Sequence, residues 1–149
     1  MLNEIYQQAE IEIPKYSLSK KYDEIIIFGC GSSYNAGLIS KFYIEEFLKT
    51  RCTVCYSSDL QYNNLSLYPE KTLFIAISQS GQTADTIRIL EKLKDRDTLV
   101  VTNDDMSQCA LLAKNVIYLD CGTEYAVAST KTFTSSILSI LNMIKGLVG

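Results

Sequence analysis

The sequence predicts an α/β protein, a three-layer sandwich in which a five-stranded parallel sheet lies between helices in a doubly wound arrangement. Short apolar runs alternate with segments of helical periodicity along the 149 residues. The connections between them are short, which favours right-handed crossovers between parallel strands. The clearest apolar runs are continuous rather than alternating, as expected of strands that are buried on both faces.

Five segments are expected to form the strands. They are residues 24–28, 53–56, 72–77, 98–102 and 116–119. The first is a continuous apolar run between a charged stretch and a glycine, which is typical of a buried strand. The connection after the second strand is polar and contains Asn63 and Asn64, so we expect a loop there.

Helices are expected between these strands and at both ends of the chain. They are residues 2–12, 34–49, 84–93, 107–114 and 133–148. Pro14 ends the first of them. In the second and third, apolar residues recur at helical spacing. We assign residues 1–22 to a leading helix and linker, and residues 23–149 to one domain.

The last helix is apolar around most of its circumference. Its polar stripe is thin, consisting of Ser135, Ser139 and Asn142. Because these polar residues recur and Lys145 interrupts the run, the pattern does not indicate a membrane span. Such a helix needs cover on more than one side. The sheet covers one side, and we expect a second copy in a homodimer or a second domain to cover the other.

Composition and charge exclude several classes of protein. The formal net charge is −3 and there is no dense run of Lys and Arg, so we expect no nucleic-acid partner. The N-terminus lacks the pattern of a signal peptide, which predicts a cytoplasmic protein with reduced thiols. Cys52 and Cys55 are three apart on an expected strand and therefore face opposite sides. With no histidine in the sequence, we expect no metal.

Three loops rich in hydroxyl side chains and glycine lie where a strand leads into a helix. They are residues 29–33, 78–83 and 127–132. Two follow strands directly and the third follows the fifth strand after a short loop, so all fall at the carboxyl edge of the sheet. Helix N-termini there offer unpaired N–H groups to an anion. Lys131 is the only cation in these loops, which predicts a phosphate site built from neutral donors.

Other interpretations of these loops are less favourable. Gly29 and Gly31 begin a dinucleotide fingerprint, but Tyr34 replaces its third glycine and only Asp59 stands for the acidic residue. We therefore expect no nucleotide cofactor, nor any other. Residues 78–83 include a possible helix cap, yet they carry more donors than one cap needs. Glu124 is either a general base or an ion-pair partner, and the structural role is the more common.

Together these motifs closely resemble the sugar isomerase (SIS) domain family. Residues 29–34 (GCGSSY), 78–86 (SQSGQTADT) and 124–134 match its three ordered motifs, with Ser32 where threonine is usual and Gln82 in place of glutamate. The closest resemblance is to the first of two SIS subdomains in the isomerase half of the glucosamine-6-phosphate synthases. Residues 4–8 also resemble the helix that leads into that half. The resemblance implies a flavodoxin-like fold.

The resemblance also implies a ligand, the 6-phosphate of a hexose or hexosamine such as fructose 6-phosphate or glucosamine 6-phosphate. The implied phosphate contacts come from residues 78–80 and Thr83, and the sugar contacts from Ser33, Ser129 and the backbone of Val127. The full set of expected binding residues is Ser32, Ser33, Ser78, Gln79, Ser80, Thr83, Val127, Ala128 and Ser129. Glu124 is the one carboxylate in the motifs that is a candidate base.

The chemical half of the site is not implied by these residues. In the synthase-like members the base, the Schiff-base lysine and the ring-opening histidine belong to the second SIS subdomain or its neighbour. We therefore expect a phosphosugar-binding domain, half of an isomerase, aminotransferase or deglycase of this family, and leave open whether the chain is itself an enzyme. The alternatives are a single-SIS isomerase that acts as an oligomer, and a non-catalytic sugar-phosphate sensor.

Overall fold

A computed structural model of the chain describes residues 1–18, 20–125 and 128–148. It contains one five-stranded sheet in the order β2-β1-β3-β4-β5, in which every neighbouring pair is parallel. The strands are β1 (Glu24–Gly29), β2 (Arg51–Tyr56), β3 (Thr72–Ile77), β4 (Asp97–Thr102) and β5 (Asn115–Tyr118). The predicted five-stranded parallel sheet is confirmed.

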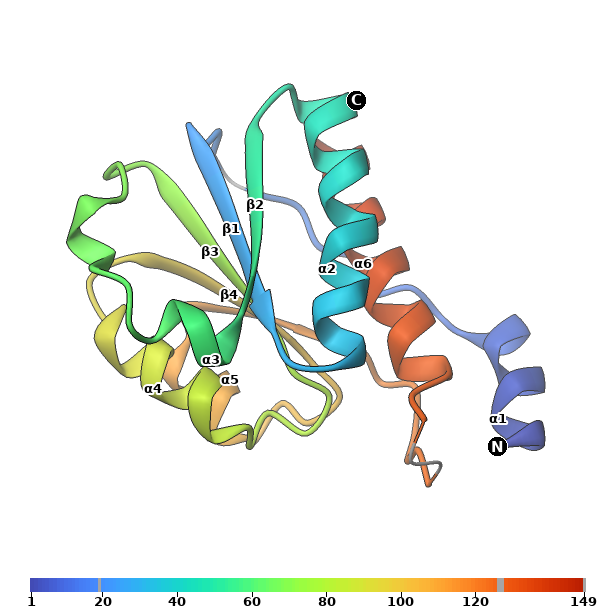
Figure 1. Ribbon diagram of the computed structural model, residues 1–149. Coiled ribbons are helices and arrows are strands. Elements are labelled where there is room, and N and C mark those ends of the chain that lie inside the picture. Colours follow the sequence, from blue (N-terminus) through green and yellow to red (C-terminus); the bar gives the residue numbers. More distant parts are fainter. Residues whose placement is uncertain (19, 126–127, 149) are drawn as a thin grey trace.

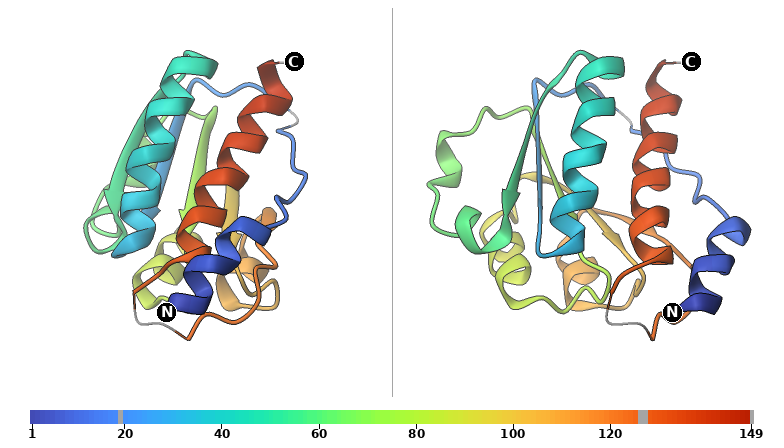
Figure 2. Two further views of the ribbon diagram at one scale, coloured as in Figure 1. Left: turned by 90° about the vertical axis from the view of Figure 1, so that its right-hand side faces the viewer. Right: turned by 45° about the vertical axis from the view of Figure 1, so that its right-hand side comes forward.

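Helices cover both faces of this sheet and complete the predicted three layers (Figures 1 and 2). One face is covered by α2 (Ser32–Tyr43), which continues as a π-helical turn to Leu48, and by α6 (Lys131–Val148). The other face carries α3 (Ser57–Leu60), α4 (Ala84–Lys92) and α5 (Gln108–Leu112). The short α3 and a 3₁₀ turn at Leu65–Leu67 lie where the sequence predicted only a loop. Elements of four and three residues are too short to show a helical periodicity in the sequence.

The two faces of the sheet contribute to separate apolar cores. Ile25 and Ile27 of β1 pack on the α2 and α6 side, whereas Ile26 and Phe28 pack on the α4 side. Every residue of β1 and β3 is buried. This is why their sequences are continuous apolar runs after the first residue of each strand, since a strand covered on both faces has no exposed positions for polar residues.

Cys52 and Cys55 lie on opposite faces of β2, as the spacing predicted, because they belong to different cores. Burial raises the pKa of the Cys52 thiol to about 12, so it stays protonated near neutral pH. All five cysteines are free thiols.

The last helix finds part of its cover within the chain. Ser135 and Ser139 of its polar stripe are fully buried. Besides the sheet, α6 packs against α2, and Asn142 Nδ2 donates to the Pro14 carbonyl at 2.9 Å. The chain itself therefore supplies part of the second cover that we expected from a partner. Among the described residues, no helix is both long and apolar enough to span a bilayer.

The leading helix is shorter than predicted. The α-helix α1 covers Leu2–Gln7 and ends in a 3₁₀ turn at Gln8–Glu10, after which Ile11 is extended. In Figure 2, α1 lies beside the N-terminal end of α6, away from the sheet. Helix α1 contacts Tyr125, which lies just before the third hydroxyl-rich loop, and Lys131 near the end of that loop.

Candidate functional site

The strand order places the first two loops on either side of a switch point. The chain leaves β1 for α2 on one face of the sheet, and leaves the adjacent β3 for α4 on the other face. The connections therefore diverge and leave a crevice at the carboxyl ends of these strands. This crevice is where ligands bind in open parallel sheets.

Two glycines determine the path of the first loop. A Cβ at Gly29 would lie 2.9 Å from both the Ile77 carbonyl oxygen and Ser33 Cβ, so only glycine fits where β1 passes β3. Gly31 has φ +56° and occupies the N-cap position of α2, where it offers no side chain to cap the helix. Ser32 and Ser33 thus begin α2 at the switch point.

The second loop is built around Gly81. Gly81 has φ +59°, and a Cβ there would lie 1.9 Å from Ser107 Oγ. Its N–H donates to the Ser78 carbonyl at 3.2 Å, which closes a tight turn. Thr83 occupies the N-cap position of α4 but its side chain makes no capping hydrogen bond, and its Oγ1 lies 3.1 Å from Ser78 Oγ. The hydroxyls of this loop are therefore not accounted for by capping α4.

The third loop is held by Glu124. Its carboxylate accepts from the Thr130 N–H at 2.6 Å and from Thr130 Oγ1 at 2.7 Å. It also accepts from Thr132 Oγ1 and from Ser129 Oγ, the latter at 3.3 Å. Burial raises the pKa of Glu124, but the hydrogen bonds from Thr132 and Thr130 outweigh burial and hold that pKa below its ordinary value. The carboxylate is thus ionised and occupied by its own loop.

The structure brings all three loops together. One small cavity is lined by residues from each of them: Ser32, Ser33, Gln79, Ser129 and their neighbours. A wider cavity of about 380 Å³ adjoins Gln79 and contains Ser80 and Glu124 in its lining. Ser78 is buried and Ser78, Thr83 and Ala128 do not line these cavities. The expected contact at Val127 lies outside the described residues.

Sequence reasoning missed a residue that joins the second loop to the segment leading into the third. Asn103 follows β4 directly and lines the wider cavity. Its Nδ2 donates to the Gly122 carbonyl at 2.8 Å, and its Oδ1 accepts from the Cys121 N–H at 3.1 Å. The signal was available, because a polar residue directly after a buried strand marks the carboxyl edge in the same way as the first two loops.

The only cation of the three loops does not point into the wider cavity. Lys131 is 5 % exposed, and its Nζ donates to Gln7 Oε1 of α1 at 3.1 Å. It lines a separate cavity of about 670 Å³ between the N-terminal segment and the loop after β5. Within the described part of the chain, no group of three His, Cys, Asp or Glu side chains could hold a metal ion. An anion at the three loops would thus be bound by hydroxyls and backbone N–H groups.

These features define a doubly wound α/β domain with a ligand crevice of hydroxyl-rich loops at its switch point. The sequence model of the SIS domain matches residues 17–145, and the chain belongs to this family. The resemblance inferred from the three motifs is therefore confirmed.

Individual proteins are also similar to this chain in sequence and in structure. The chain is 34 % identical to glutamine–fructose-6-phosphate aminotransferase (isomerizing) of Clostridium perfringens and 40 % identical to that of Listeria monocytogenes, over 96 % and 94 % of its length. A solved structure, the C-terminal domain of glucosamine-fructose-6-phosphate aminotransferase from Francisella tularensis, superposes with a TM-score of 0.84 at 31 % identity.

Coverage sets the limit of this relationship. The chain spans about a quarter of each of these curated relatives, 24 % in both cases. The structural superposition covers 99 % of this chain, but only 47 % of the Francisella domain. What is similar is thus one unit of about half that domain.

Proposed function

We propose that this chain binds the 6-phosphate of a hexose or hexosamine at its three hydroxyl-rich loops. The phosphate would lie on residues 78–83, and the sugar between the first and third loops. The observation that carries the proposal is the second loop, in which the Ser78 and Thr83 hydroxyls lie 3.1 Å apart at the start of α4 and the Thr83 side chain does not cap that helix.

Physical chemistry favours a phosphate over other ligands here. A dianion near neutral donors gains from the N-terminus of α4, where N–H groups and the helix dipole face the ligand. Gln82 contributes no negative charge beside that position, and Ser80 Oγ already accepts from the Gln82 N–H at 3.2 Å. The Ser80 hydroxyl hydrogen is thus free to be donated to a phosphate oxygen.

The nature of the sugar is supported by the relatives. Their name places fructose 6-phosphate among their substrates, and the three motifs are shared with their family. The wider cavity beside Gln79, at about 380 Å³, falls in the range of small-molecule sites. Fructose 6-phosphate and glucosamine 6-phosphate are therefore the first ligands to test.

We infer that the chain supplies the binding half of such a site. Isomerisation requires a base that moves a proton between neighbouring carbons. Glu124 is the candidate, but a lowered pKa makes a carboxylate a weaker base, and its oxygens accept bonds from its own loop. Its catalytic role remains a prediction, and we propose that a second SIS unit contributes the chemistry of an isomerase, aminotransferase or deglycase.

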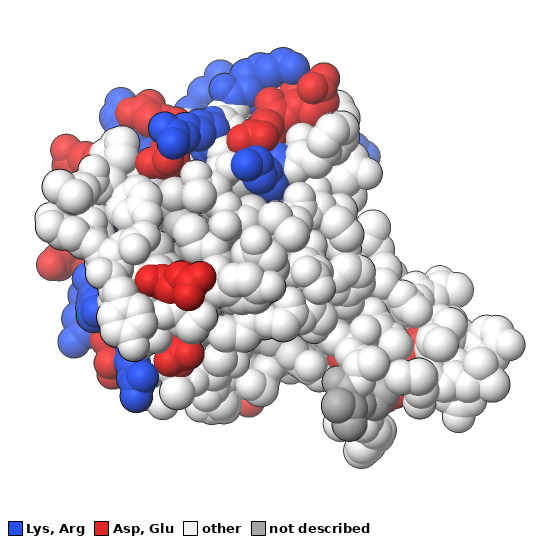
Figure 3. Space-filling view, viewed as in Figure 1, with Lys and Arg blue, Asp and Glu red and all other residues white. Residues whose placement is uncertain are grey.

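The outer face of α2 is the surface we propose for that second unit, in a homodimer or beside another SIS domain. Leu38, Ile39 and Phe42 are exposed there, Phe42 by 67 %. Residues 25–40 contain no charged side chain. In Figure 3, charged side chains gather toward the upper and left edges, and the surface over α2 is largely uncharged below its upper end. An apolar face of this kind is typical of an interface.

Calorimetric titration tests the binding proposal. We expect fructose 6-phosphate to bind with a micromolar to millimolar Kd and fructose not to bind. The double variant Ser80→Ala with Thr83→Ala should weaken binding at least about tenfold, because it removes two hydroxyl donors. Ser58→Ala with Ser66→Ala is the matched control, since both are exposed serines outside the three loops. Binding that survives the first double variant would contradict the proposal.

Light scattering tests the interface. We expect the wild-type chain to form dimers at micromolar concentration and Phe42→Glu to be monomeric, because a buried, unpaired carboxylate at an apolar interface is costly. Leu111→Glu is the control, an exposed apolar residue of α5 on the opposite face of the sheet. A monomeric wild-type chain would leave a separate SIS domain as the partner.

A further inference from the structure

Helix α1 buries a glutamate rather than its apolar side chains. Glu4 is 5 % exposed, whereas Leu2, Ile5 and Tyr6 on the same helix are exposed. Surface helices normally bury their apolar stripe and expose their charges. The position of α1 is therefore determined by specific polar contacts rather than by burial of its own apolar face.

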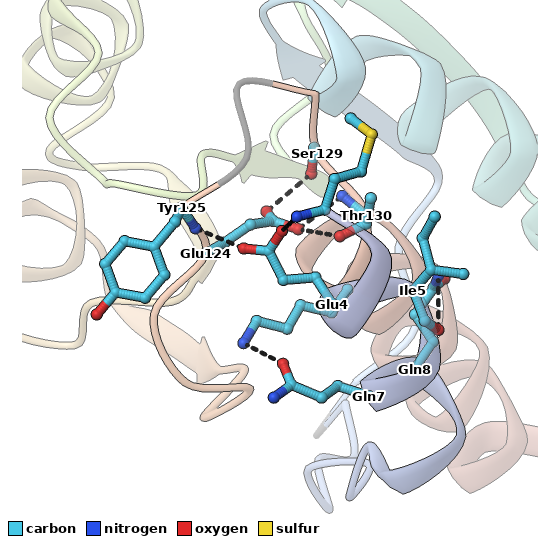
Figure 4. Close-up of polar contacts among 10 residues, drawn as sticks. Glu4, Ile5, Gln7, Gln8, Glu124, Tyr125, Ser129 and Thr130 are labelled. Atoms are coloured by element: carbon cyan, nitrogen blue, oxygen red, sulfur yellow. Dashed lines mark hydrogen bonds and ion pairs between the residues drawn. The ribbon is translucent and has the colours of Figure 1, made fainter.

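Three side chains of α1 and the turn that follows it supply these contacts. Glu4 Oε1 accepts from the Tyr125 N–H at 2.6 Å (Figure 4). Gln7 Oε1 accepts from Lys131 Nζ at 3.1 Å, and Gln8 Oε1 accepts from Thr134 Oγ1. Positions 4, 7 and 8 have the i, i+3, i+4 spacing that places residues on one helical face.

These contacts fall on both sides of the proposed sugar loop. Tyr125 comes just before the residues expected to contact the sugar, and Lys131 begins α6 just after them. A buried ammonium is costly unless it is hydrogen-bonded, so the Gln7 acceptor favours one orientation of Lys131. Figure 4 shows Glu4 and Gln7 extending from α1 toward this segment.

We propose that α1 positions the third loop for the sugar, with Glu4 as the main positioning residue and Gln7 as its support. This inference rests on the proposed function. Glu4 does not touch the ligand and acts through the backbone of Tyr125. Helix α1 therefore contributes to ligand binding by holding the third loop, although it lies outside the three loops themselves.

The second loop provides an internal reference for this proposal. It is fixed by residues of the main fold, since the Gly81 carbonyl accepts from the Cys109 N–H and the Gln79 carbonyl accepts from the Asn103 N–H. None of these contacts involves α1. Loss of the Glu4 contact should therefore weaken binding of a whole sugar phosphate while leaving binding of inorganic phosphate unchanged.

The experiment compares two ligands on the full chain. For Glu4→Ala we expect about tenfold weaker binding of fructose 6-phosphate, because a charged acceptor for a backbone N–H is lost. The Kd of inorganic phosphate, measured by chemical-shift titration, should stay unchanged. Glu4→Gln should recover much of the affinity, since its amide oxygen can accept the same bond. Ile5→Ala, on the outward side of the same helix, is the matched control.

The outcomes separate this inference from the proposed function. A wild-type chain that binds neither ligand overturns the proposed function. If Glu4→Ala and the wild-type chain bind fructose 6-phosphate equally tightly, the positioning role alone is overturned. A parallel loss of both ligands in Glu4→Ala indicates general loosening and also overturns it.

A second variant and a second measurement keep the test decisive. Gln7→Ala replaces Glu4→Ala if the latter is unfolded at the assay temperature, because the Gln7 side chain is exposed. We expect a loss of several-fold that is again confined to the sugar phosphate. Hydrogen exchange should quicken at Tyr125 in Glu4→Ala and stay unchanged in residues 78–83. Unchanged exchange at Tyr125 would contradict the role of Glu4.

Discussion

The second and third loops meet in one crevice but are held in different ways. Residues 78–83 are anchored through their own backbone: the Gln79 carbonyl accepts from the Asn103 N–H at 3.0 Å and from the Thr102 hydroxyl at 3.2 Å, both at the end of β4. The third loop is anchored by side chains, with Glu124 bonded to Thr130 and Glu4 to Tyr125. A loop bound into the sheet edge is fixed once the sheet forms, whereas a loop held by side chains depends on each of them. The phosphate end of the site should thus be the more rigid one.

The largest effect is expected from Gly81→Ala, which disrupts the anchored loop. The new Cβ would lie 1.9 Å from Ser107 Oγ, and φ +59° disfavours any side chain. We expect the free energy of unfolding to fall by about 3 kcal/mol and phosphate binding to be lost. Urea unfolding followed by circular dichroism measures the first, and calorimetry the second.

Gly31→Ala is the matched control for that change. Gly31 also has positive φ, at +56°, but a Cβ there meets no atom within 4 Å. Only backbone strain remains, and because φ +56° with ψ −126° lies outside the left-handed α region, the expected loss is about 2 kcal/mol. Equal losses at the two glycines would show that close packing against Ser107 does not fix the second loop.

A smaller effect is expected from Glu124, which anchors the third loop. We expect Glu124→Gln to lower the free energy of unfolding at pH 7 by about 1–2 kcal/mol, because charged acceptor bonds are weakened. The pKa of Glu124 is lowered in the fold, so its contribution is present above the ordinary value of 4.5 and is lost as the pH falls through the folded value. As the pH falls below 4.5, the free energy of unfolding should therefore decrease less in Glu124→Gln than in the wild-type chain.

Asp97 is the control for this pH dependence. Hydrogen bonding from Lys20 lowers the pKa of Asp97, with an ion-pair distance of 2.6 Å, and Lys114 adds to the effect. Salt should weaken the acid-sensitive contribution of this ion pair, while that of Glu124, which is bonded to hydroxyls and an N–H, should change little. If salt changed the stability loss caused by Glu124→Gln as much as that caused by Asp97→Asn, the third loop would not be anchored by hydrogen bonds from uncharged groups.

The same difference explains how much could be predicted from the sequence. The sheet and the positions of the first two loops follow from continuous apolar runs and from the glycines after β1 and β3, which are local signals. The orientation of Lys131 could not be predicted, because its acceptor on Gln7 is 124 positions away. The burial of Ser135 and Ser139 was also hidden, since hydroxyls on an apolar helix do not show which neighbour they face.

The smallest effect is expected at the junction of the two loops. Asn103 follows β4, so its backbone belongs to the anchored edge, while its side chain bonds to Gly122 and Cys121 of the third loop's approach. We expect Asn103→Ala to cost about 1 kcal/mol in unfolding free energy and to weaken fructose 6-phosphate binding by several-fold. Because the Asn103 N–H to Gln79 contact is retained in the variant, binding of inorganic phosphate should not change. If both ligands weakened equally, the two loops would behave as one rigid unit, and the difference in their anchoring would have no consequence for the site.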